Sequence, residues 1–133
     1  MLFDVKNTPL SVPFLQAFTY IRDANKLPIW TNAFAKVNND GTALMSTPQG
    51  EVTIQLDVIS DEKLGTVDWK MTFADGSQGI AHSRVIPLSE ASCAYSFILT
   101  PPPVPLEMME GALAEQGTIL EKELVTLKAV LEN

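Results

Sequence analysis

Polar and apolar residues alternate through the middle of the chain. The apolar residues of segment 52–58 are separated by single polar ones, and segment 67–73 repeats the pattern. Successive side chains of a β-strand point to opposite faces, so each segment has one apolar face and one polar face. Turn signals rich in Gly, Asp and Asn at 38–41 and 74–77 separate such segments. The pattern therefore predicts consecutive strands joined by hairpins, as in an antiparallel sheet.

Seven segments are expected to form strands, one before and six after a pair of helices. They are 2–5, 34–37, 42–46, 52–58, 67–73, 79–87 and 92–100. Pro9 is expected to end regular structure after the first strand, because proline has no N–H for a sheet ladder.

Two helices are expected between the first and second strands. Apolar residues recur at helical spacing within 11–23. This spacing predicts an amphipathic helix with Ser11 as its N-cap and Pro13 in its first turn. A second, short helix is expected to begin at Leu27 and to reach Ala33 or Phe34.

A long helix is expected at the C-terminal end. From residue 106 the apolar positions are spaced by three, four or seven, which places them in one stripe along a helix. The stripe consists of Leu106, Met109, Leu113, Leu120, Leu124, Leu127 and Leu131. Gln116 and Gly117 interrupt it, through a local widening of the packing or through simple tolerance. Because such a stripe packs against the apolar face of a sheet, the sequence predicts one α+β domain over 1–133.

Composition and charge narrow the classes of partner. The 133 residues are 46% hydrophobic and 19% charged, with a net charge of −7. So acidic a surface repels phosphate, so neither nucleic acid nor an anionic membrane surface is an expected partner. No apolar run is long enough for membrane insertion. Cys93 is the one cysteine and no secretory signal is visible, so a reducing, cytoplasmic location is expected.

Several short segments carry a family resemblance. They are YIRD at 20–23, LPIW at 27–30, VDW at 67–69, RVIP at 84–87 and LVTLK at 124–128. With the order of elements, they resemble the helix-grip fold of the START-like (SRPBCC) superfamily, which includes polyketide cyclase/dehydratase-like, pathogenesis-related and lipid-transfer proteins. They are most similar to its small single-domain bacterial branch. The resemblance implies an elongated apolar cavity between a curved sheet and the long helix, but no single chemistry.

Signatures of cofactor and metal chemistry are missing from the sequence. There is no Gly-rich phosphate loop, and one Cys and one His cannot build a standard zinc site. No segment resembles a nucleophile elbow. Neither a cofactor nor a metal is therefore expected.

The strand register decides the role of the single histidine, His82. With a two-residue turn at 75–76, His82 lies opposite Trp69, and Arg84 lies opposite Tyr95 on the next strand. All four then face the cavity. A His, an Arg and a Tyr hydroxyl among aromatic walls can hydrogen-bond a carbonyl, an enolate or a carboxylate, so these three are the candidate catalytic residues.

A second register remains open. A three-residue turn with a bulge shifts the pairing and reverses every side chain. Arg84 then pairs with Asp68, His82 lies beside Lys70, and both are on the polar face. Ala81, Ser83 and Val85 then pack inward.

The expected ligand-binding set follows the cavity-facing register. It comprises Trp30, Phe34, Trp69, Met71, His82, Arg84, Tyr95, Phe97, Met109 and Leu113. Trp30 and Phe34 border the mouth or are plain core anchors. Met109, Leu113 and also Leu120 form the ceiling of a pocket or only the ordinary stripe of a packed helix. The glutamates of the long helix are expected to be solvated.

Three functions compete. The first is binding of a small hydrophobic or aromatic molecule, lipid-like or polyketide-like, in the cavity. The second is a cofactor-free cyclase, dehydratase or isomerase, in which orientation of a flexible chain promotes ring closure. The third is a ligand-free regulator whose acidic helix meets a basic partner. The sequence is compatible with a homodimer in each case.

Overall fold

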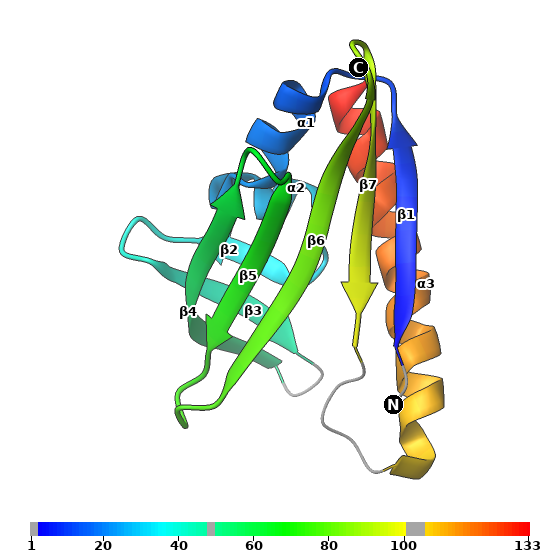
Figure 1. Cartoon of the computed structure of the whole chain (residues 1–133). Coiled ribbons are helices and arrows are strands. Elements are labelled where there is room, and N and C mark those ends of the chain that lie inside the picture. The colour runs from blue at the N-terminus through cyan, green and yellow to red at the C-terminus, as the bar shows by residue number, and fades with distance from the viewer. Residues whose placement is uncertain (1–2, 48–49, 101–105) are drawn as a thin grey trace.

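The architecture is taken from a computed structural model of the chain (Figure 1). It describes residues 3–47, 50–100 and 106–133, and only the backbone of Leu106 and Met109. The elements are β1 (Asp4–Leu10), α1 (Phe14–Ile21), the 3₁₀ turn η1 (Ala24–Lys26), α2 (Leu27–Trp30), β2 (Phe34–Val37), β3 (Thr42–Thr47), β4 (Gly50–Asp61), β5 (Thr66–Thr72), β6 (Gln78–Ser89), β7 (Ser92–Leu99) and α3 (Leu106–Leu131). The expected order of strand, two helices, six strands and long helix is confirmed.

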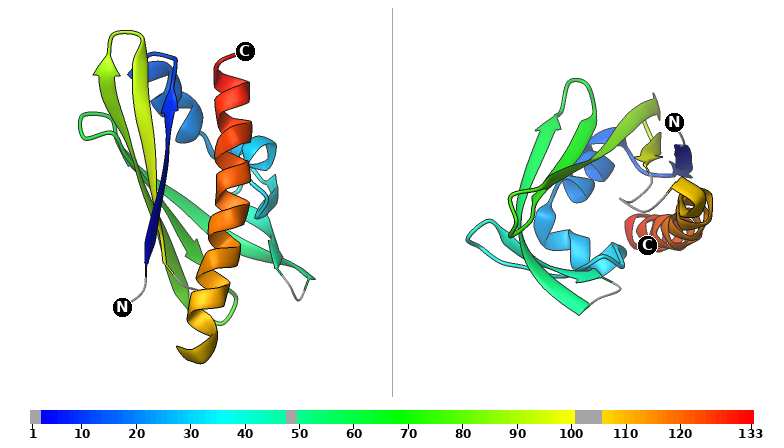
Figure 2. Two further views of the ribbon diagram at one scale, coloured as in Figure 1. Left: turned by 90° about the vertical axis from the view of Figure 1, so that its right-hand side faces the viewer. Right: turned by 90° about the horizontal axis from the view of Figure 1, so that it is seen from below.

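The seven strands form one antiparallel sheet in the order β1-β7-β6-β5-β4-β3-β2. Strands β2 to β7 follow one another as hairpins, and β7 then pairs with β1. The sheet curls, and the helices lie on its concave side (Figure 2). Helix α3 runs along the β1 edge of the sheet. Helix α1 contacts β6 and β7, and α2 contacts β2 and α3. The predicted α+β class, with a curved antiparallel sheet around a long C-terminal helix, is confirmed.

The core lies between the concave face of the sheet and the leucine stripe of α3. Leu120, Leu124 and Leu127 are at most 4% exposed, and they join the inward residues of the sheet in one cluster. Full burial of one leucine contributes about 1.5–3 kcal/mol, so the stripe holds helix and sheet together. Among the described residues, no helix combines the length and the apolarity needed to cross a bilayer.

The first strand and first helix differ from the prediction. Strand β1 extends to Leu10 and includes Pro9, which pairs with Ala94. Pro9 is tolerated because β1 is an edge strand and pairs with β7 alone. Leu2, where the predicted strand began, lies outside the described residues.

Helix α1 begins three residues later than expected, and Ser11 is not its N-cap. Pro13 occupies that position in an extended conformation, with no side-chain cap. The Ser11 amide instead donates a 3.0 Å hydrogen bond to Glu132 Oε2 at the end of α3. The second helix, α2, ends at Trp30, because Phe34 already belongs to β2.

The β5–β6 hairpin contains a three-residue turn. The Phe73 amide donates to Ser77 O, and the Asp75 carboxylate accepts from both the amide and the hydroxyl of Ser77. Gly76 supplies the positive φ of +86° that such a loop needs. The predicted two-residue turn at 75–76 is therefore wrong, and every side chain of β6 faces opposite to the cavity-facing register.

Gly117 in α3 permits a close approach of β1. A Cβ there would lie 3.2 Å from Lys6 Cε. The Lys6 ammonium group bonds Glu121 at 2.7 Å and Asp4 at 3.4 Å. The interruption of the leucine stripe thus makes room for a lysine that links the edge strand to the helix.

Gly65, between β4 and β5, lies directly against the backbone of β6. Its φ is +74°, and a Cβ would lie 2.1 Å from Val85 O. The Val85 amide donates a 2.8 Å hydrogen bond to Gly65 O. This contact joins the β4–β5 turn to β6.

We predict that Gly65→Ala lowers the free energy of unfolding by about 3 kcal/mol, since it adds a backbone collision to left-handed strain. Gly41→Ala is the matched control: its φ is +87°, and no atom lies within 4 Å of the added Cβ. It should cost about 1 kcal/mol. Urea unfolding of both variants measures the difference, and equal losses would contradict the role of the Val85 contact.

Candidate functional site: an aromatic cavity beneath the C-terminal helix

A cavity of about 170 Å³ lies between the concave face of the sheet and α3. Its walls come from five strands, from α2 with the segment that follows it, and from α3. The lining residues are Leu27, Trp30, Thr31, Ala33, Phe34, Met45, Trp69, Met71, Ala81, Phe97, Leu120 and Glu123. Apart from Thr31 and Glu123, every lining side chain is apolar or aromatic. The cavity is therefore suited to an apolar guest with a polar group near Glu123.

Stacked aromatic rings form the wall on the sheet side. Trp69 and Phe97 stack with centroids 6.1 Å apart. Trp30 lies 6.3 Å from Trp69 and meets Tyr95 edge-on at 6.2 Å. Such ring pairs are rigid and hold one another in place. The wall is thus a preformed surface for another planar ring.

Three hydrogen-bond donors in this cluster are buried without a partner among the described residues. They are the indole N–H groups of Trp30 and Trp69 and the hydroxyl of Tyr95. Buried polar groups in folded proteins are nearly always partnered, and each that is not costs about 1–3 kcal/mol. Burial raises the pKa of Tyr95 well above its usual range, and the neighbouring Ser83 hydroxyl opposes this only in part. The Tyr95 hydroxyl therefore keeps its proton.

Among the described residues, Glu123 is the one ionisable side chain that lines the cavity. Its Oε2 accepts a 2.6 Å hydrogen bond from the backbone N–H of Asn32, just beyond α2. Burial raises the pKa of Glu123 above that of an ordinary glutamate, and the Asn32 hydrogen bond lowers it by less. A half-buried carboxyl with a raised pKa, beside apolar walls, has the chemistry of a general acid or base.

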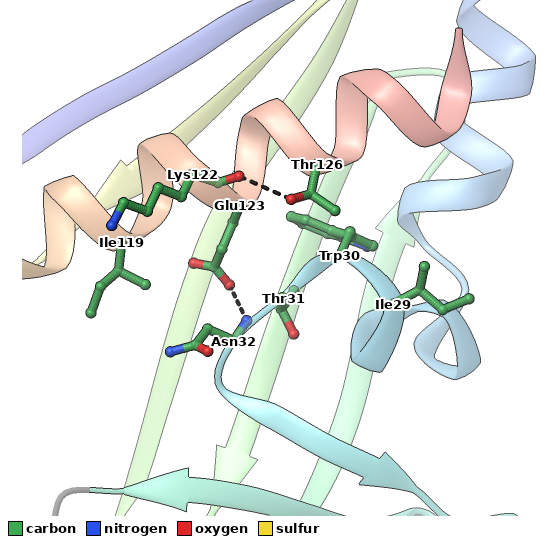
Figure 3. Close-up of a pocket in the computed structure, with 8 residues that line it drawn as sticks. All are labelled: Ile29, Trp30, Thr31, Asn32, Ile119, Lys122, Glu123 and Thr126. Atoms are coloured by element: carbon green, nitrogen blue, oxygen red, sulfur yellow. Dashed lines mark hydrogen bonds between the residues drawn. The ribbon is translucent and has the colours of Figure 1, made fainter. Parts of the chain in front are cut away.

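A shallower groove of about 360 Å³ opens outside the cavity, between α2 and α3 (Figure 3). Five residues line the groove and not the inner cavity: Ile29, Asn32, Ile119, Lys122 and Thr126. Three further residues, Trp30, Thr31 and Glu123, line both the groove and the inner cavity. Those three mark the place where the inner cavity meets the outer groove.

Five of the predicted ligand-binding residues line the cavity. They are Trp30, Phe34, Trp69, Met71 and Phe97. Tyr95 is fully buried and packs behind Trp30, and Leu113 is buried in α3 outside the lining. Leu120, also expected as a ceiling residue, does line the cavity. The side chain of Met109 lies outside the described residues.

The prediction that His82 and Arg84 face the cavity is wrong. His82 pairs with Asp68, so both side chains are on the outer face, and its imidazole Nδ1 lies 3.3 Å from the Asp68 carboxylate. Arg84 lies opposite Thr66, and its Nε donates a 2.8 Å hydrogen bond to Leu64 O. The second register had the correct face but placed the pairing two residues away. Among the described residues, the polar groups that line the cavity are instead two indoles, the Thr31 hydroxyl and the Glu123 carboxyl group.

Sequence reasoning missed Glu123, which was expected to be solvated with the other helix glutamates. One signal was present. Position 123 follows Leu120 by three residues and precedes Leu127 by four, so it lies at the edge of the apolar stripe. Ala81 faces inward, as the second register had it. The expected set did not include four further lining residues, Leu27, Thr31, Ala33 and Met45.

The comparisons with known proteins agree on the architecture. No protein-family model and no curated protein matches the sequence. Solved structures do match. XoxI from Bacillus cereus is 14% identical with a TM-score of 0.72, over 100% of this chain and 97% of that one. A START superfamily protein from Mycobacterium smegmatis is 14% identical with a TM-score of 0.66, over 97% and 98% of the two chains.

The chain has the helix-grip fold of START-like proteins. The Zhui aromatase/cyclase from Streptomyces sp. R1128 has this fold too, at 10% identity and a TM-score of 0.62, over 98% of this chain and 92% of that one. The cavity of the present helix-grip chain lies between its sheet and its long helix, as the resemblance implied.

We predict that Glu123→Gln stabilises the protein near neutral pH and not near pH 4. Burial raises the pKa of the folded-state carboxyl above its unfolded value. The folded protein therefore binds the proton more tightly, and stability falls as pH rises from the unfolded pKa through the folded one. Glutamine keeps an oxygen for the Asn32 N–H and carries no charge. The gain in melting temperature should grow between about pH 4 and pH 7.

Glu115→Gln removes a charge from an exposed position of α3 and is the control for net charge. Thermal unfolding of both variants and the parent across this range gives the comparison. A pH-independent difference for Glu123→Gln would mean that its carboxyl is not shifted by burial.

Proposed function

We propose that the protein binds a small molecule with one aromatic ring in the cavity between the sheet and α3. The observation that carries the proposal is the cavity itself: about 170 Å³, walled by Trp30, Trp69 and Phe97, with a carboxyl group at its edge. A ring stacked there gains burial and aromatic contact with side chains that already hold one another. The fold of START-like and aromatase/cyclase structures supports the same use of this space.

The volume of the cavity limits the size of the guest that fits. A cavity of about 150 Å³ lined by apolar side chains binds benzene in another protein, and drug-sized ligands need about 300–1,000 Å³. The inner cavity thus suits a single ring, and substituents on that ring would extend into the groove beside α2. A sterol or a long acyl chain exceeds the inner space, so lipid-like guests are less well supported than aromatic ones.

We predict that Ala81→Leu abolishes binding of toluene, because the larger side chain fills the floor of the cavity. Ala81 is half-buried on β6, opposite Trp69. Ala94→Leu is the matched control, since Ala94 is on the outer face of the neighbouring strand and pairs with Ile86. Titration of the indole N–H resonances of Trp30 and Trp69 with toluene measures the binding.

The parent protein and Ala94→Leu should show saturable shifts of the indole resonances, and Ala81→Leu should show none. Decanoate and a sterol serve as size controls that should not compete with toluene. If toluene leaves the indole resonances of the parent protein unchanged, the proposed function is wrong.

A second function, catalysis of an aldol ring closure, is favoured by one observation: the raised pKa of the half-buried Glu123 carboxyl. As carboxylate, it would remove a proton from a carbon next to a carbonyl. Folding a flexible chain within the aromatic walls would supply orientation.

A linear triketone, heptane-2,4,6-trione, tests the second function. Its terminal methyl carbon attacks the distant carbonyl, and loss of one water gives the aromatic diol orcinol. We predict that the parent protein accelerates the appearance of orcinol and that Glu123→Gln lowers this rate at least tenfold, a typical contribution of a general base being 10²–10⁴. Equal rates for the parent, Glu123→Gln and Glu115→Gln would eliminate a role for Glu123 in such chemistry.

A further inference from the structure

We propose that the cavity selects a neutral ring that carries a hydroxyl group, such as a phenol, over a carboxylate of the same size, and that Glu123 makes this selection. The inference rests on the proposed function and adds the chemical class of the guest. It depends on which hydrogen-bonding groups around the cavity are already used and which are not.

The Glu123 carboxylate has one occupied oxygen and one unoccupied oxygen. Oε2 accepts the 2.6 Å hydrogen bond from the Asn32 backbone, which fixes the orientation of the carboxyl group. Within the part of the chain that the structure describes, no group donates to Oε1. Glu123 lines both the inner cavity and the outer groove. A guest seated against the aromatic wall can therefore donate a hydrogen bond to the Glu123 carboxylate.

The indole N–H groups of the wall are out of reach of a guest. Trp30 and Trp69 line the cavity, but their indole nitrogens are buried with almost no accessible surface, so a guest oxygen does not fit against them. A hydroxyl group on the guest can donate a hydrogen bond. A phenol can therefore donate to Glu123, whereas a hydrocarbon ring cannot.

An anionic guest meets the opposite situation. Among the described residues that line the inner cavity, no side chain is positively charged. Lys122 lines the outer groove alone. A carboxylate on the ring would face the Glu123 carboxylate in a site of low polarity, where like charges repel strongly. The same site that accepts phenol should therefore reject benzoate near neutral pH.

Three rings of matched size test the inference: toluene, phenol and benzoate, titrated near neutral pH with the indole N–H resonances as the readout. The parent protein should bind phenol about tenfold more tightly than toluene, as expected for a hydrogen bond to a charged group. It should bind benzoate roughly 100-fold more weakly than phenol.

Glu123→Gln is the decisive variant. Its amide oxygen still accepts from Asn32, and its amide N–H₂ presents donors where the free carboxylate oxygen was an acceptor. The preference for phenol over toluene should fall, because a neutral amide is a weaker partner for the phenol than a carboxylate, and benzoate affinity should rise relative to toluene affinity. Glu115→Gln, which makes the same charge change on the exposed face of α3, should behave as the parent.

The possible results separate the inference from the proposed function. If toluene binds but phenol binds no better, or if Glu123→Gln leaves the affinity ratios among the three rings unchanged, the inference is wrong and the proposed function stands. If none of the three rings binds, both are wrong.

Discussion

Contact between the leucine stripe of α3 and the concave face of the sheet is the constraint on which the rest of the structure depends. Leu120, Leu124 and Leu127 are nearly inaccessible to solvent, and α3 runs along the β1 edge of the sheet on its concave side (Figure 2). The contact is closest beside β1, where Gly117 lets Lys6 approach the helix. Toward α2 it is less complete, and there the aromatic cavity lies. The cavity thus lies where the contact between α3 and the sheet is incomplete, on the side of α2.

Periodicity predicted the elements because burial imposes it directly. A strand at the surface of a core alternates in polarity, and a helix on that core carries a stripe, so both patterns survive in the sequence. The α+β class, the consecutive strands β2 to β7 and the inward positions of Trp69, Met71 and Phe97 followed from this. The cavity, with Trp30 and Phe34 at its mouth, was expected from the family resemblance. Boundaries such as the end of β1 were less well defined, because the edge position that tolerates Pro9 is a property of the sheet and not of the local sequence.

The chemistry of the site was harder to predict, for two physical reasons. Whether His82 faces the core depends on one residue of turn length. That length is decided by the hydrogen bonds of Asp75 to Ser77 and by the backbone of Gly76, and the segment 74–77 is compatible with either turn. Glu123 was missed because it is at the margin of the stripe, where a helical position is exposed or buried according to what α2 places beside it.

The hydrogen bond from Asn32 to Glu123 links the rim of the cavity, formed by the segment after α2, to helix α3. One oxygen of this carboxylate anchors the rim segment after α2 to α3 (Figure 3), and the other accepts no hydrogen bond from a described residue. The side chain that holds the rim segment after α2 is therefore the same one that would recognise the proposed guest. Under the proposed function, a substitution of Glu123 during evolution would change the choice of guest and the rigidity of the rim segment together.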